Sequence, residues 1–265
     1  MEFWNSVFHY TSITLAYMQM DFLESHQDLL VKQTRKGWLM ELCCGCDANT
    51  EFKIATLDDP ENDILYATEN TSCCIRVICG PLRPFTITVS EGAVSGGKTH
   101  SLHKRRRACP PCCCKCCCFQ QIEARNPNVT SIGKVIENIW CCVPSFTVFD
   151  VNQNEQYIIQ QPTCCGGCCV NCCAEGFCSC RVPFYIYEPG QHVAGQEVGK
   201  VVKIWSGLLN ELFTDADKFE LRFPVNADGH NKTRLLSATF LINELFFENQ
   251  GSSGGDGDGG NGGDS

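Results

Sequence analysis

The chain has 265 residues, 43% of them apolar and 19% charged, which is the composition of a globular protein and excludes an intrinsically disordered one. Its formal net charge of −9 argues against general affinity for nucleic acids, although a local basic patch can still attract phosphate groups. The 23 cysteines are an odd number, and no signal peptide is recognisable in Met1–Met20, so we expect reduced thiols that face the cytosol.

The first half of the chain has the pattern of short β-strands. Apolar and polar residues alternate, and β-branched or aromatic residues are frequent, in four segments separated by turn-forming residues. These segments are Glu51–Leu57, Asp63–Glu69, Cys73–Cys79 and Pro84–Ser90. Next, Gly92–Thr99 (GAVSGGKT) fits the P-loop pattern of nucleotide-binding proteins, but no helix pattern follows it, so we interpret it as a hairpin loop.

A basic and cysteine-rich segment comes next, in which Lys104, Arg105, Arg106 and Arg107 precede two cysteine triplets that flank Lys115. Neighbouring cysteines cannot all converge on one tetrahedral zinc ion, and a disulfide between them is strained, whereas thioester acylation needs no mutual geometry. Acyl chains combined with a polybasic patch anchor a protein stably to a membrane. We therefore predict that the four basic residues bind anionic lipids beside S-palmitoyl groups; metal binding and a loop without a special role are the alternatives. The predicted acylation sites are Cys112, Cys113, Cys114, Cys116, Cys117 and Cys118.

The second half of the chain repeats the strand pattern. Its segments are Gln120–Arg125, Ile132–Trp140, Ser145–Val151, Glu155–Gln161, Val182–Glu188, Glu197–Trp205 and Lys218–Pro224. Short strands at close spacing indicate an antiparallel sandwich or barrel. A weak internal similarity favours two pseudo-repeated halves around one core, with closure into a barrel to remove the sheet edges; chance similarity between strands is the alternative. In this interpretation Lys200 and Lys203 face the solvent.

A second cysteine-rich stretch, Cys164–Cys180, has the C-x₂-C spacing that suits zinc. The candidate ligands are Cys165, Cys168, Cys169 and Cys172. The two pairs lie closer together than in a zinc ribbon, so a second acylated loop and a purely structural loop stay open beside a Zn²⁺ site.

Two segments predict helices, Ser206–Phe213 and Thr233–Phe247, and the chain ends in a Gly- and Asp-rich segment, 251–265, that we expect to be disordered. The second helix is apolar around its circumference, which indicates burial in protein or in lipid. Fifteen residues span about 22 Å, short of a hydrocarbon core of roughly 30 Å. Asn243 and Glu244 add a further cost in a bilayer, so we favour a helix buried inside the barrel.

From about Leu29 to Glu248 the chain resembles the phospholipid scramblase family. The resemblance lies in Tyr66–Val89, Cys112–Pro127, Ile132–Trp140, Gly199–Pro224 and Leu235–Glu248, whose order and spacing match that family. It implies a tubby-like barrel of about twelve strands over residues 29–248, closed around the C-terminal helix, after a divergent N-terminal segment, 1–28. It also implies acylation of the cysteine cluster, a response to Ca²⁺ and movement of phospholipids between bilayer leaflets.

The resemblance places a Ca²⁺ segment at Asp215–Asn226. Compared with an EF-hand loop, Asp215 and Asp217 fill the first and third positions, and Asn226 stands where a bidentate acid is needed. Few strong oxygen ligands predict a weak Ca²⁺ site, and a solvated acidic turn is the alternative.

The resemblance and the residues together predict a phospholipid scramblase-like protein at the cytosolic face of the plasma membrane. Its activity would be ATP-independent, Ca²⁺-stimulated and bidirectional, without bond chemistry and without catalytic residues. The alternative is a palmitoylated adaptor or regulatory protein that enters the nucleus when unacylated and does not scramble lipids itself.

Overall fold

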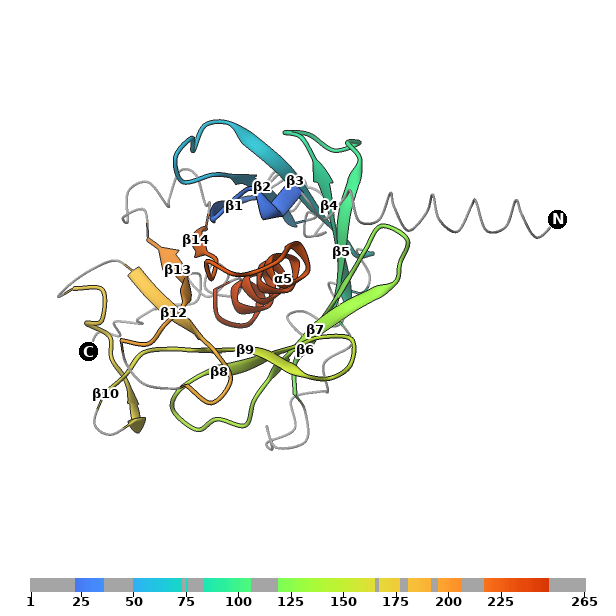
Figure 1. Ribbon diagram of the computed structural model, residues 1–265. Coiled ribbons are helices and arrows are strands. Elements are labelled where there is room, and N and C mark those ends of the chain that lie inside the picture. Colours follow the sequence, from blue (N-terminus) through green and yellow to red (C-terminus); the bar gives the residue numbers. More distant parts are fainter. Residues whose placement is uncertain are drawn as a thin grey trace, which may run out of the picture.

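The computed structural model describes residues 22–35, 50–72, 75, 83–105, 119–164, 167–176, 181–191, 195–205 and 217–247. Twelve strands within these residues close into one antiparallel barrel around the helix α5 (Gly229–Phe246), as Figure 1 shows. This confirms the predicted fold class. Around the barrel the strands are β1 (Asp28–Arg35), β14 (Lys218–Arg222), β13 (Gly199–Ile204), β12 (Arg181–Tyr187), β9 (Glu155–Gln160), β8 (Ser145–Phe149), β7 (Ser131–Glu137), β6 (Gln121–Arg125), β5 (Thr99–Arg105), β4 (Phe85–Glu91), β3 (Asp63–Asn70) and β2 (Thr50–Ala55).

Closure of the barrel depends on β1, which pairs with β14 on one side and with β2 on the other. The register places Asp28 opposite Arg222 and Arg35 opposite Thr50. Because these pairings join the ends of the strand series, the wall has no exposed edge that could pair with another chain. A small separate hairpin, β10 (Thr163–Cys164) and β11 (Cys169–Val170), lies in the connection from β9 to β12.

The wall follows the alternation seen in the sequence. In β4, Phe85, Ile87 and Val89 are buried against the interior, and the threonines between them are partly exposed. The inward apolar side chains of the other strands, except β5, join these residues and the apolar side chains of α5 in one hydrophobic core.

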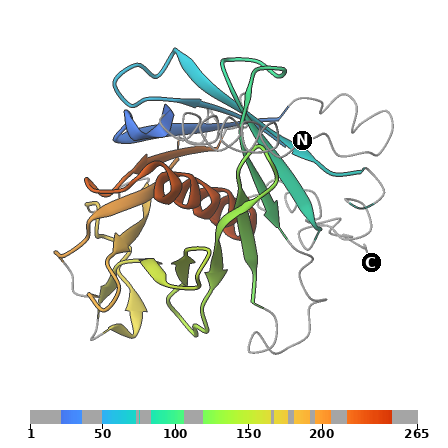
Figure 2. The same ribbon diagram turned by 45° about the vertical axis from the view of Figure 1, so that its right-hand side comes forward.

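Helix α5 runs through the barrel, as the turned view in Figure 2 shows. Asp228 caps its start by accepting a hydrogen bond from the backbone N–H of Asn231 at 2.7 Å. The predicted helix is confirmed and begins four residues earlier than the pattern indicated, at Gly229. Phe240 packs on the ring of Phe52, with centroids 5.0 Å apart, and on the imidazole of His103 at 5.1 Å. The helix is therefore part of the barrel core.

Two strands of the barrel wall were not predicted, β1 and β5, and neither was the small β10–β11 hairpin. The interior face of β5 carries Ser101, His103 and Arg105, all buried, so the strand lacks an apolar face and its sequence resembles a polar loop. The segment Gly92–Thr99 connects β4 to β5, and a strand follows it rather than a helix, so the hairpin interpretation is confirmed. The predicted helix Ser206–Phe213, the tail 251–265 and all of Cys73–Cys79 except Ile75 lie outside the described residues.

Candidate functional site

The connections between barrel strands divide into two sets, because neighbouring strands run in opposite directions. We call one end of the barrel the cysteine end. Its connections leave the wall after β1, β3, β5, β7, β9 and β13, and they comprise residues 36–49, 71–84, 106–120, 138–144, 161–180 and 205–217. All 23 cysteines of the chain belong in sequence to these six connections. The connections at the opposite end contain none.

Charge divides the two ends in the same way. The connections of the cysteine end contain six basic and six acidic residues, so their formal charges cancel. Those of the opposite end, which we call the acidic end, contain seven acidic residues and one basic residue. The acidic ones are Asp58, Asp59, Glu61, Asp150, Glu188, Glu197 and Asp228. An anionic surface would therefore repel the acidic end and tolerate the cysteine end.

The predicted lipid-binding basic residues do not share one environment. Lys104 is exposed on β5, as predicted, but the neighbouring Arg105 points into the barrel and is fully buried. The inclusion of Arg105 in a lipid-binding patch is therefore wrong, because alternation along β5 sends its side chain inward. Arg106, Arg107 and the predicted acylation sites Cys112–Cys118 lie outside the described residues.

Arg105 belongs to a buried ion-pair network at the cysteine end of α5. It donates from Nη1 to Glu244 Oε1 at 3.0 Å and from Nη2 to Gln120 Oε1 at 2.7 Å. Arg83 contacts the same Glu244 oxygen at 3.1 Å and donates two hydrogen bonds to Glu69, at 2.9 and 3.0 Å. Two guanidinium groups thus face two carboxylates, which balances charge inside a low-dielectric core.

The network continues toward the rim through Glu137. This carboxylate accepts hydrogen bonds from the backbone N–H of Gln120 at 3.3 Å and from Trp140 Nε1 at 2.8 Å. The ring of Trp140 lies 6.3 Å from that of Phe246, in the last turn of α5. Sequence reasoning missed this network. Its available signal was Glu244, which together with Asn243 interrupts the apolar stretch Leu235–Phe247.

The Ca²⁺ candidates are not brought together. Asp217 precedes β14 at the cysteine end, whereas Asn226 follows β14 at the acidic end. A five-residue strand spans roughly 16 Å, and two ligands of one Ca²⁺ ion lie within about 5 Å of each other. Asp217 and Asn226 therefore cannot share an ion, and an EF-hand-like loop over this segment is wrong because a strand occupies its centre. Asp215 lies outside the described residues.

Asp217 instead forms an ion pair with Lys203. The prediction that Lys203 faces the solvent is wrong, because its side chain is only 1% exposed and shares the inner face of β13 with Val201. Its ammonium group lies 4.8 Å from the ring of Trp205, 5.5 Å from Phe219 and 5.8 Å from Phe247, the residue that ends α5. Asp217 is thus connected, through Lys203, to the end of α5.

Exposed thiols also lie at the cysteine end. Cys141 and Cys142, between β7 and β8, have their sulfur atoms 3.8 Å apart. A hydrogen bond with Cys141, together with the charges of Cys141, Cys169 and Cys168, raises the pKa of Cys142. The two connections that carry these cysteines also meet at a backbone hydrogen bond, which the N–H of Gln161 donates to the carbonyl of Pro144 at 3.3 Å.

The zinc prediction has no support in the described residues. Cys168, Cys169 and Cys172 are exposed, and Cys165 lies outside the residues that the structure describes. Within that described part, no group of three or more His, Cys, Asp or Glu side chains is placed to hold a metal ion.

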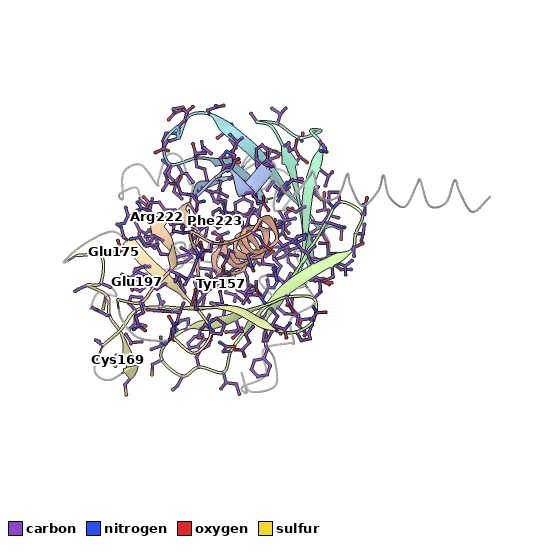
Figure 3. The ribbon with its side chains drawn as sticks, in the orientation of Figure 1. Tyr157, Cys169, Glu175, Glu197, Arg222 and Phe223 are labelled. Carbon is purple, nitrogen blue, oxygen red and sulfur yellow. The ribbon has the colours of Figure 1, made fainter. Side chains whose placement is uncertain are left out.

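Glu175 holds the cysteine-rich hairpin against the barrel wall. It accepts hydrogen bonds from Lys200 Nζ at 2.7 Å and from the Tyr185 hydroxyl at 3.3 Å, and burial is the main cause that raises the pKa of Tyr185 to about 12. Figure 3 shows Glu175 near the wall and Cys169 farther out, on the side away from α5. The hairpin thiols are thus presented outward from a fixed base.

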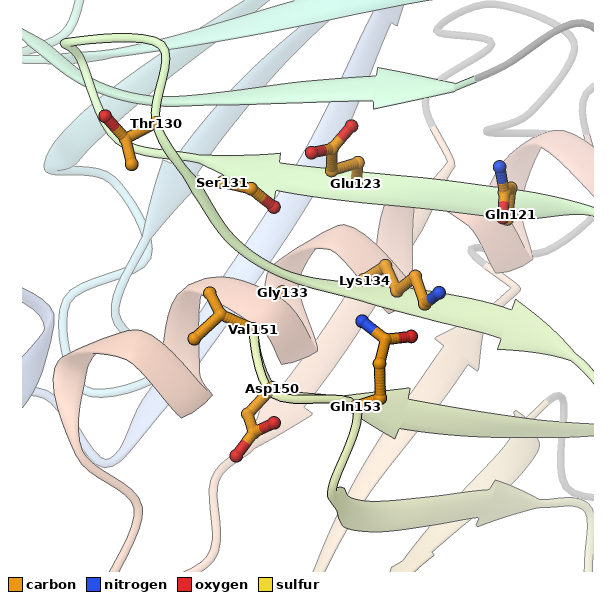
Figure 4. Close-up of a pocket in the computed structure, with 9 residues that line it drawn as sticks. All are labelled: Gln121, Glu123, Thr130, Ser131, Gly133, Lys134, Asp150, Val151 and Gln153. Carbon is orange, nitrogen blue, oxygen red and sulfur yellow. The ribbon is translucent and has the colours of Figure 1, made fainter.

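A polar pocket on the outer wall, lined by residues of β6, β7 and the β8–β9 connection, is another candidate site, and Figure 4 shows its lining. Its two carboxylates, Glu123 and Asp150, point away from each other. Arg125 contacts Glu123 at 2.8 Å, and Asp150 accepts backbone hydrogen bonds from Asn152 and Asn154, which lower its pKa. These carboxylates serve the local structure, so the cysteine end is the stronger candidate.

Comparisons with known proteins agree with the resemblance. The sequence model of the Scramblase family matches residues 10–249. Phospholipid scramblase 1 of Homo sapiens is 34% identical over 233 residues, which cover 88% of this chain and 67% of that protein. Phospholipid scramblase 2 of Bos taurus is 33% identical over 229 residues, with coverage of 86% and 71%. The chain thus spans about two thirds of the length of these relatives.

No solved structure matches the chain. Within the part of the chain that the structure describes, none of the helices has the length and apolar character needed to cross a bilayer.

Proposed function

Because the chain belongs to the phospholipid scramblase family, we propose that it equilibrates phospholipids between the two leaflets of a bilayer. In this proposal the movement is bidirectional, independent of ATP and stimulated by Ca²⁺. It is transport without bond chemistry, so no catalytic residue is assigned. The observation that carries the proposal is the family match over residues 10–249.

We propose that the cysteine end attaches the protein to the cytosolic face of the plasma membrane. Palmitoylation of Cys112–Cys118 would supply the acyl chains, and Lys104, Arg106 and Arg107 would bind anionic headgroups, each contributing on the order of 1 kcal/mol. The charge difference between the two ends supports this orientation. Without its acyl groups the protein would leave the membrane, and the nucleus is then a proposed destination.

Stimulation by Ca²⁺ is proposed to act through Asp217. A Ca²⁺ ion bound to this carboxylate, with Asp215 as a second ligand, would displace Lys203 from its ion pair. Lys203 also contacts the ring of Phe247, so its release would loosen the contact at the end of α5. Because Ca²⁺ must compete with a buried ammonium group, the expected affinity is weak.

The substitution Asp217→Asn tests this route. It removes the charge that Ca²⁺ needs while keeping a side chain of the same shape, so we expect stimulation by Ca²⁺ to be lost. Asn226→Ala is the matched control, because Asn226 belongs to the same predicted segment but lies at the other end of β14. The measurement is the Ca²⁺ dependence of lipid scrambling; equal stimulation of Asp217→Asn and the native protein would refute the route.

Scrambling itself is measured with the purified, acylated protein in liposomes that carry a fluorescent lipid in both leaflets. A membrane-impermeant quencher removes the signal of the outer leaflet alone unless lipids exchange between leaflets. We expect Ca²⁺-dependent quenching beyond half of the signal. Quenching that stops at half, with folded and liposome-bound protein, would contradict direct scrambling and would support the lipid-anchored adaptor instead.

A further inference from the structure

The exposed thiols of the β7–β8 connection and of the β10–β11 hairpin have no role in the function proposed above. Cysteine is among the residue types most often buried in proteins, where it acts as a small apolar side chain. In this chain the cysteines Cys141, Cys142, Cys168 and Cys169 are all exposed, and none of the cysteines that the structure describes belongs to a strand of the barrel wall. Packing therefore does not explain these four thiols.

Metal binding does not explain them either. They form no metal-binding group within the described residues. A disulfide between the sequence neighbours Cys141 and Cys142 would be strained.

We propose that Cys141, Cys142, Cys168 and Cys169 form a second S-acylation site. In this reaction the cysteine sulfur attacks the carbonyl carbon of a long-chain acyl-coenzyme A, the bond from that carbon to the coenzyme A sulfur breaks, and the released thiol takes the proton. No oxidant is needed. The acyl-coenzyme A and the acyltransferase that uses it are the only partners required.

Three observations carry the proposal. The four thiols are exposed, they lie on two connections joined by the hydrogen bond from Gln161 N–H to the Pro144 carbonyl, and Glu175 binds the connection that bears two of them to the barrel wall. They are also flanked by Ile139, an apolar side chain that is 74% exposed and adjacent to the first pair in sequence. The acidic end exposes valines as well, so apolar exposure alone does not distinguish the ends; the thiols do.

The proposal rests on the membrane attachment proposed above, and it fixes an orientation. Acyl chains on the β5–β6 connection and on the β7–β8 and β9–β12 connections, two and four strands farther around the rim, would hold the barrel at separate points. A single acyl chain binds only marginally, whereas two signals anchor stably. The barrel would then stand on its cysteine end, with the acidic end farthest from the anionic leaflet.

The test uses the full chain expressed in cells that are fed an alkynyl fatty acid. Removal of the predicted cluster by Cys→Ser at Cys112, Cys113, Cys114, Cys116, Cys117 and Cys118 is expected to leave hydroxylamine-sensitive label on the protein. Further substitution of Cys141, Cys142, Cys168 and Cys169 by Ser is expected to abolish that remaining label. The matched control replaces Cys172 and Cys173 instead, which are exposed in the same connection, just after the hairpin, and are not among the groups that raise the pKa of Cys142.

Mass spectrometry of the native protein gives a second readout that needs no variant. The peptides with Cys141–Cys142 and Cys168–Cys169 are expected to carry thioester-linked acyl groups. Unmodified, disulfide-linked or metal-retaining peptides would overturn the proposal, as would full loss of label with the first variant. Because this readout measures acylation and not lipid movement, its failure is distinguishable from failure of the scrambling proposal.

Discussion

Burial inside the barrel lowers the pKa of His103 to about 3, from an ordinary value of 6.5, and the nearby His100 adds to this effect. The neutral imidazole lies between two hydroxyl groups, with Nε2 2.9 Å from Ser101 Oγ and Nδ1 2.5 Å from Ser237 Oγ. A neutral histidine on β5 is thus hydrogen-bonded to α5. At the cysteine end of α5, Glu244 connects the helix to Arg83 and Arg105.

His103 predicts a pH dependence of stability. Between pH 6.5 and about 3 the unfolded chain binds a proton that the folded chain excludes. The stabilisation is therefore complete above pH 6.5 and is lost as the pH falls, by about 1.4 kcal/mol per pH unit. Urea unfolding at about pH 7 and about pH 5 measures this loss. Between these two pH values, the free energy of unfolding of His103→Asn should fall by roughly 2 kcal/mol less than that of the native protein. An unchanged loss in the variant would contradict the assignment.

Glu244 predicts a large effect of a single charge. Glu244→Gln leaves two buried guanidinium groups facing one carboxylate, so we expect the free energy of unfolding to fall by about 3–5 kcal/mol. The control Glu123→Gln removes one member of a partly exposed pair with Arg125 and should cost less than about 1 kcal/mol. Chemical denaturation measures both; equal effects would show that the buried network does not stabilise the helix in the barrel.

At the scale of elements, α5 is fixed at both ends. Asp228 caps it at the acidic end, and at the cysteine end Trp140 packs near Phe246 while Trp205 lies 6.3 Å from Phe247. The strands around it supply apolar side chains along most of its length and polar ones from β5. The helix therefore has one defined depth and rotation inside the barrel.

The cap gives a prediction at this scale. Asp228→Ala removes the acceptor for the backbone N–H of Asn231, so we expect the free energy of unfolding to fall by about 1 kcal/mol. Asp59→Ala changes an exposed acid in another connection of the acidic end and should have little effect. Urea titration compares the two variants, and indistinguishable midpoints would contradict a stabilising cap.

The elements that could be predicted are those with an apolar face. Strands such as β4 and β9 alternate clearly, and the C-terminal part of α5 is largely apolar, so sequence pattern alone indicated them. In contrast, β5 was missed because its inward residues match polar groups on α5, a pairing that is visible only after folding. The internal similarity paired Cys73–Val89 with Cys178–Tyr187 and Ser131–Trp140 with Glu197–Trp205. It was partly informative: β4 and β12, from the first pair, each stand fourth in their half of the barrel, whereas β7 and β13, from the second, do not correspond.

The candidate site was predictable in composition but not in geometry. The basic and cysteine-rich segments were found from sequence, and chain connectivity then assigned them to one end of the barrel. Arg105 and Lys203 were placed on the surface because charged residues are rarely buried. Their burial follows from partners distant in sequence, Glu244 and Asp217, which no local pattern identifies.

At the scale of the whole molecule, the barrel is polarised along its axis. Every cysteine belongs to a connection at one end, and an excess of acidic residues marks the connections at the other. Helix α5 follows the same axis, beginning at the acidic end and finishing at the cysteine end. Acylation, lipid binding and the Ca²⁺ response are therefore all proposed at the end where the helix finishes.

The most direct test of this account is amide hydrogen exchange of the acylated protein, compared between detergent and anionic liposomes. Protection on liposomes is expected in the cysteine-end segments 138–144 and 167–176. The acidic-end turns 126–130 and 150–154 should exchange equally in both conditions. Protection of the acidic-end turns, or of neither set in liposome-bound protein, would contradict the claim that the cysteine end faces the bilayer.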